Sequence, residues 1–146
     1  MHKVERSALV PFSAHDMFAL VNDIGGYPEF LPWCKQTDIH ERTHDLVIAS
    51  IHVSKGVFNK SFTTKNYLQH NRSMRMELVD GPFEAFHALW QFDVLEKDAC
   101  RVVFSADFRF SNRVLDMTLG PIFDRIANTM LDAFCERAHT LYGMTS

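Results

Sequence analysis

A near-continuous alternation of apolar and polar residues between positions 34 and 111 constrains the fold more than any other feature of this sequence. Apolar side chains recur there at about every second position, the spacing of strands that bury one face. The segments with this spacing are Lys35–Glu41, Leu46–Ser54, Val57–Gln69, Ser73–Asp80, Glu84–Leu95 and Cys100–Phe110. The breaks between them are short, and a parallel crossover needs a dozen or more residues. The pattern therefore predicts a large sheet of antiparallel hairpins.

One more strand and a short helical region precede this stretch. Lys3–Phe12 has strand character, and Ser13 is suited to cap a helix over Ala14–Asn22. Gly25-Gly26 is expected to end that helix. The aromatic segment Tyr27–Trp33, which holds two prolines, is expected to form at most one further helical turn.

A long amphipathic helix is predicted at the other end of the chain. Val114–Tyr142 carries apolar residues at helical spacing, and Gly120-Pro121 is expected to kink or restart the helix. A sheet with one apolar face needs a cover, which this helix can provide. We therefore expect an α+β fold in a single domain, residues 1–146. Its curved antiparallel sheet of about seven strands would wrap around the C-terminal helix, with two short helices after the first strand.

Composition excludes several functional classes. Apolar residues make up 47% of the chain and the net charge is −3, which argues against a protein that coats nucleic acid and against DNA as a partner. No apolar run is long enough to span a membrane or to form a signal-peptide core. The three cysteines, Cys34, Cys100 and Cys135, lie far apart, which indicates reduced thiols in a cytoplasmic protein.

Alternation also predicts which side chains face inward, and this set is large and aromatic, in keeping with the 13 phenylalanines of the chain. One interpretation is a solid core, and another is a sheet that grips the helix around a cavity for a flexible apolar ligand. Lys60, Thr64 and Asn66 share the inner face of their strand with Phe58 and Phe62. Such polar residues fit better where the inner face opens toward a mouth.

The segment His40-Glu41-Arg42-Thr43-His44 matches the zinc-protease pattern His-Glu-x-x-His. That pattern needs a helix, which brings both imidazoles to one metal ion. Here it lies in a strand and turn, where residues four apart are roughly 13 Å from each other. We therefore expect a polar hairpin and no metal site.

No other motif identifies chemistry. The sequence has no P-loop, no Gly-x-Ser-x-Gly and no recognisable pair of nucleophile and base, so we expect a protein that is not an enzyme. Five cations fall in one hairpin region, which indicates either a solvated edge or a contact with RNA or a partner protein. They are Lys55, Lys60, Lys65, Arg72 and Arg75.

Several strings resemble the coenzyme-Q-binding START-like family, part of the polyketide cyclase-like superfamily. The most specific is Tyr27-Pro28-Glu29-Phe30-Leu31-Pro32-Trp33-Cys34, and the match covers nearly the whole chain. The others are Leu20–Ile24, Phe62–Thr64, Leu78–Phe83, Trp90–Phe92, Cys100–Val102, Phe108–Phe110 and Met130–Ala138. The family includes mitochondrial ubiquinone chaperones and bacterial ribosome-association toxins of a toxin–antitoxin type. The tryptophan at position 33 resembles the chaperone sequences more than the toxin sequences.

The resemblance implies a helix-grip fold whose apolar tunnel binds ubiquinone or a related isoprenoid lipid without chemistry, in support of respiration. The alternative it implies is a toxin that binds the large ribosomal subunit and blocks subunit association. Entrance loops would contain Tyr27, Phe30, Pro82 and Phe83, with transient contact of Phe30 and Trp33 with a membrane surface. The expected cavity residues are Trp33, Phe62, Met74, Met76, Trp90, Phe92, Phe104, Phe108, Phe123, Ile126 and Met130.

Overall fold

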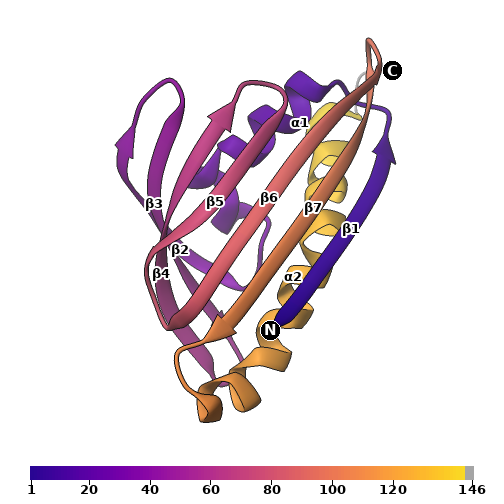
Figure 1. Ribbon diagram of the computed structural model, residues 1–146. Helices are drawn as coiled ribbons and strands as arrows, with labels where there is room; N and C mark the ends of the chain where they lie inside the picture. The colour runs from indigo at the N-terminus through magenta and orange to yellow at the C-terminus, as the bar shows by residue number, and fades with distance from the viewer. Residues whose placement is uncertain (144–146) are drawn as a thin grey trace.

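One seven-stranded sheet forms the body of the structure, a computed structural model described over residues 1–143 (Figure 1). Its strands follow the order β1-β7-β6-β5-β4-β3-β2, and every neighbouring pair is antiparallel. The strands are β1 His2–Val10, β2 Cys34–Arg42, β3 Leu46–Lys55, β4 Phe58–Gln69, β5 Ser73–Asp80, β6 Phe83–Glu96 and β7 Ala99–Phe110. This sheet confirms the prediction made from the alternation and the short turns.

Two short helices connect β1 to β2. Helix α1 spans Ala14–Asn22, and the Ser13 hydroxyl caps it by accepting a hydrogen bond from the Asp16 backbone N–H at 3.0 Å. The 3₁₀ helix η1 follows over Ile24–Glu29. The expectation that Gly25-Gly26 ends the first helix is wrong in detail. That helix ends at Asn22, and both glycines lie within η1.

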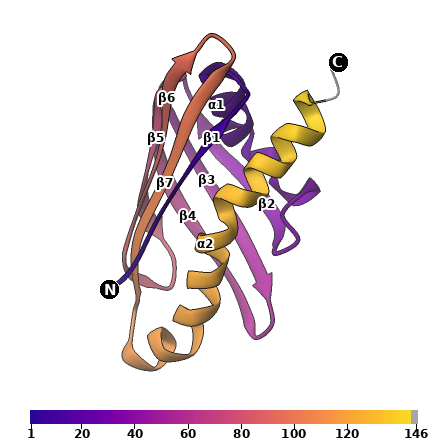
Figure 2. The same ribbon diagram turned by 90° about the vertical axis from the view of Figure 1, so that its right-hand side faces the viewer.

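Helix α2, Arg113–Tyr142, lies across the inner face of the sheet (Figures 1 and 2). It begins where the Asn112 side chain accepts a hydrogen bond from the Leu115 backbone N–H at 2.9 Å. It continues through Pro121, although its first turns, orange in Figure 2, run at an angle to the rest. The helix-grip architecture is therefore confirmed. No helix within residues 1–143 is both long and apolar enough to cross a bilayer.

The predicted inner faces are buried with few exceptions. Val94 is 70% exposed, because the β6–β7 hairpin extends past the helices that cover the sheet (Figure 1). Lys60 is exposed near the start of β4. Thr64 and Asn66 are fully buried, and the Thr64 hydroxyl donates to the Asn66 side-chain oxygen at 3.0 Å. These two residues are therefore hydrogen-bonded to each other inside the core and do not mark a mouth.

Candidate functional site

An apolar cavity lies between the sheet and α2. Its volume is about 40 Å³, counted as the space open to the centres of water-sized spheres. The residues around it belong to or pack against the continuous cluster of buried hydrophobic side chains that forms the core. Its walls come from η1, the segment before β2, the strands β3 to β7 and α2. They comprise Tyr27, Trp33, Ile51, Val53, Phe62, Met76, Phe86, Ala88, Trp90, Phe104, Ala106, Phe123, Ile126, Ala127, Met130 and Phe134.

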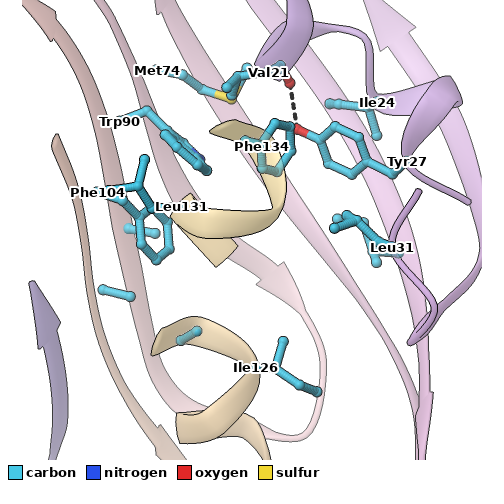
Figure 3. Packing of buried hydrophobic residues seen from close by; sticks show 14 of the residues in the cluster. Val21, Ile24, Tyr27, Leu31, Met74, Trp90, Phe104, Ile126, Leu131 and Phe134 are labelled. Carbon is cyan, nitrogen blue, oxygen red and sulfur yellow. Dashed lines mark hydrogen bonds between the residues drawn. The ribbon is translucent and has the colours of Figure 1, made fainter. Parts of the chain in front are cut away.

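Most of the residues expected at a cavity do border this one. They are Trp33, Phe62, Met76, Trp90, Phe104, Phe123, Ile126 and Met130. Met74, Phe92 and Phe108 are instead buried in the surrounding core and do not line it. Figure 3 shows Trp90 and Phe104 from the sheet close to Phe134 from α2, with Ile126 farther along the same helix.

Sequence reasoning did not assign Phe134 to the cavity, although it occupies a central position. Its ring lies 5.0 Å from that of Trp90 and 5.3 Å from that of Tyr27, both edge to face. The signal was present in the sequence, because Ile126, Met130 and Phe134 follow one another at four-residue intervals on one helix face. The small residues Ala88, Ala106 and Ala127 had no such signal, since alanine is common in any core.

The residues expected at the entrance lie deeper than expected. Tyr27 is 6% exposed, and its hydroxyl donates a hydrogen bond to the Val21 carbonyl (Figure 3). Burial, with smaller contributions from Cys34 and Asp23, raises the pKa of Tyr27 far above its ordinary range, so the phenol stays neutral. Phe83 is also 6% exposed, whereas Pro82 is only partly buried.

The segment expected to touch a membrane is packed against the protein. The Phe30 ring lies edge to face against Phe134 at 5.0 Å, and the Arg137 guanidinium lies 5.2 Å from its centre. Trp33 is only 8% exposed. Neither ring is presented to a bilayer in this conformation.

The chemistry of the cavity lining is almost entirely apolar. Tyr27 is its single titratable residue. The other polar groups of the lining side chains are the indole N–H groups of Trp33 and Trp90. The lining therefore surrounds a bound molecule with apolar side chains, and it presents no pair of groups suited to acid–base or nucleophilic catalysis.

His40 and His44 have separate partners. His40 lies in β2, as the strand prediction required, and its Nε2 atom is 2.6 Å from the Ser50 hydroxyl. His44 lies in the β2–β3 turn, where its ring stacks on that of His70 at 4.3 Å. Within residues 1–143, no group of three or more His, Cys, Asp or Glu side chains is placed to hold a metal ion.

The five cations of the hairpin region are spread over β3, β4, β5 and the turn between the last two strands. Lys55 ends β3, Lys60 lies near the start of β4, and Arg72 lies in the β4–β5 turn. Lys65 and Arg75 flank the Tyr67 ring at 5.8 and 4.4 Å, and Arg75 is paired with Glu77. They form no single basic cluster.

Comparison with known proteins places these features in context. Residues 10–135 match the family model described as polyketide cyclase / dehydrase and lipid transport. A protein named ribosome association toxin RatA, from Pseudomonas aeruginosa, is 44% identical over 140 residues, which cover 96% of this chain and 97% of that protein.

A more distant relative and a solved structure of similar fold were also found. The mitochondrial coenzyme Q-binding protein COQ10 of Drosophila melanogaster is 27% identical over 97% of this chain and 60% of its own length. The crystal structure of the Zhui aromatase/cyclase from Streptomyces sp. R1128 superposes with a TM-score of 0.78. It covers 94% of this chain and 93% of its own at 16% identity, and this likeness concerns the fold alone.

Proposed function

This chain belongs to the polyketide cyclase / dehydrase and lipid transport family, and from that premise we propose that it holds a polyprenyl quinone, such as ubiquinone, between α2 and the sheet without chemically changing it. The observation that carries the proposal is the lining of the internal cavity, which is apolar except for Tyr27 and the two indoles. Transfer of an isoprenoid tail into such a lining is favourable by about 25 cal/mol per Å² of apolar area.

The polar groups of the cavity favour a quinone head over a plain hydrocarbon. The Trp33 and Trp90 indole N–H groups are donors on residues that line the cavity, and a quinone brings two carbonyl acceptors. A hydrogen bond from either indole to a quinone carbonyl would contribute about 0.5–1.5 kcal/mol. The similarity to a coenzyme Q-binding protein, at 27% identity, supports the same class of ligand.

The cavity must enlarge to hold the ligand, because about 40 Å³ accommodates only a few water-sized spheres. The side chains best suited to move are Met76 and Met130, which are flexible, lie on opposite walls and are only partly buried. The proposed sequence of events is therefore entry of the ring, displacement of these methionines and burial of the tail along α2.

The cavity lining contains no pair of residues suited to catalysis, which supports binding without chemical change. The proposal places the protein in the cytoplasm. A titration tests it. Both tryptophans line the cavity, so a soluble ubiquinone analogue should quench their fluorescence saturably. Met76→Lys should abolish quenching, whereas Val79→Lys, at a 55% exposed site on the same strand, should not.

Circular dichroism must show that both variants are folded. Mass spectrometry of lipid extracted from the native protein gives an independent test. Non-saturable quenching together with no extracted isoprenoid would contradict the proposal.

A second candidate is association with the large ribosomal subunit, which would block subunit joining. The observation in its favour is the 44% identity with a ribosome association toxin over nearly the whole of both chains. Cosedimentation with purified subunits at rising salt tests it, because binding through phosphates weakens steeply with salt. The two candidates are separable, since Met76→Lys removes ligand binding without altering the cations on the surface.

A further inference from the structure

One end of the molecule carries an exposed apolar surface that lies outside the lining of the internal cavity. We define this basal patch as Lys55, Gly56 and Val57 of the β3–β4 turn together with Val114, Met117, Pro121, Ile122 and Arg125 of α2. Val57 is 81% exposed, Met117 71% and Val114 70%. Three large apolar side chains at this exposure in one region are more than an ordinary surface requires.

The two parts of the basal patch meet in space. Lys55 and Gly56 of the turn and Pro121, Ile122 and Arg125 of the helix line one shallow groove. Val114, Met117 and Pro121 follow at helical spacing, so they continue the same face of α2 toward its first turn. In both views the β3–β4 turn and the start of α2 lie at the lower end of the molecule (Figures 1 and 2).

Both charged members of the basal patch are cations. Lys55 and Arg125 are its charged members, and Arg113 precedes it at the start of the helix. The nearest carboxylates along α2 are directed to partners of their own. Asp116 contacts His2 at 3.2 Å, and Asp124 accepts a hydrogen bond from the Asn128 amide at 3.1 Å.

Apolar side chains flanked by cations are the combination that binds the interface of an anionic bilayer. We propose that the basal patch docks this protein on an anionic lipid surface, with Val57, Val114 and Met117 inserted among the headgroups. The alternative of a phosphate-rich RNA surface would use the cations but would leave these three apolar side chains in water.

The basal patch lies close to the cavity, which suggests that docking serves ligand exchange. This part of the inference rests on the proposed function. Phe123 and Ile126 line the cavity from the opposite face of the same helix segment, and Val53 does so from β3, two residues before Lys55. Pro121 cannot donate the backbone hydrogen bond of a regular helix, so α2 is weakened where it separates patch from cavity. A docked molecule would thus exchange its ligand with the bilayer at this end.

Sedimentation with lipid vesicles tests the docking. The full chain should bind vesicles of phosphatidylcholine with one quarter phosphatidylglycerol at least tenfold more tightly than vesicles of phosphatidylcholine alone. Each Lys or Arg near an anionic surface strengthens binding about fivefold, so Lys55→Glu with Arg125→Glu should weaken it more than tenfold. Val57→Asp with Met117→Asp should weaken binding to the anionic vesicles to a similar extent.

The β6–β7 hairpin at the opposite end provides matched controls. Val94→Asp alters a 70% exposed valine and Lys97→Glu an exposed lysine, and neither should change vesicle binding more than twofold. The proposal is overturned if the wild type does not bind anionic vesicles, or if the controls lose as much binding as the patch variants. It is also overturned if the charge variants lose binding and Val57→Asp with Met117→Asp does not, which would indicate a polyanion such as RNA.

The two proposals fail in different ways. Every patch variant lies outside the cavity lining, so each should keep the saturable quenching by the quinone analogue. Vesicle binding without quenching contradicts quinone binding alone, whereas quenching without vesicle binding contradicts the docking surface alone.

Discussion

The Asp116 carboxylate accepts a hydrogen bond from the Phe110 backbone N–H at 3.0 Å and thereby joins the first part of α2 to the last residue of β7. This bond is the main reason why the pKa of Asp116 lies below its ordinary value of 3.8. Burial opposes the shift, and His2 adds to it. Because the folded-state pKa is the lower one, the carboxylate stabilises the fold above pH 3.8, and this contribution is lost as the pH falls through the folded-state pKa.

We predict that Asp116→Asn lowers the free energy of unfolding at pH 7 by about 1 kcal/mol, because a hydrogen bond to a charged acceptor becomes one to a neutral amide. The difference from wild type should shrink as the pH falls below 3.8. Urea denaturation over a pH series measures it. Asp98→Asn, in the exposed β6–β7 turn, should show no such difference. A gap that stays constant into acid would contradict the assignment.

Gly81 permits a close approach between the β5–β6 turn and the cavity wall. A Cβ atom at this position would lie 2.6 Å from the Phe62 Cβ atom, well inside contact distance. We predict that Gly81→Ala destabilises the protein by about 1–3 kcal/mol because Phe62 must move. Gly25→Ala is the matched control, since a Cβ atom there meets nothing within 4 Å. Thermal unfolding that ranks the two variants equally would refute this account.

Phe123 is the centre of an aromatic cluster on the inner face. Its ring lies 4.8 Å from that of Phe108 and 5.2 Å from that of Phe83. We predict that Phe123→Ala lowers the free energy of unfolding by about 3 kcal/mol, through lost contacts and an enlarged cavity. Chemical denaturation measures the loss, and Phe123→Leu, which keeps more of the volume, should lose clearly less. A loss below about 1 kcal/mol would mean that the ring is poorly packed.

Two buried cysteines should be unreactive in the folded protein. Burial raises the pKa of both Cys34 and Cys100 to about 11, because it disfavours the thiolate. We therefore predict that iodoacetamide alkylates them at pH 8 roughly 100-fold more slowly in native protein than in urea, and faster as the pH rises. Mass spectrometry of timed samples gives the rates. Rapid native labelling of either thiol would contradict the burial of that residue.

Much of the fold could be predicted from local patterns. A strand that buries one face alternates its side chains, and short turns require antiparallel pairing, so the sequence predicted the strands β2 to β7 to within a residue or two at each end. The Ser13 cap and the face of α2 that carries Ile126 and Met130 followed from helical spacing in the same way. The residues of β7 that face the core could be predicted equally well from the alternation.

Tertiary packing decided the site itself. No local pattern reports the size of an internal space, because it depends on how side chains from distant elements fit together, and the cavity is only about 40 Å³. The same reason explains why Tyr27 and Phe83 are interior, and why Thr64 and Asn66 are buried as a hydrogen-bonded pair. The basal patch depends on the β3–β4 turn and α2 bordering one groove, which Gly56 and Pro121 line although they are far apart in the chain. Periodicity thus determined which face each residue occupies, and packing of the sheet against α2 determined which of those residues meet.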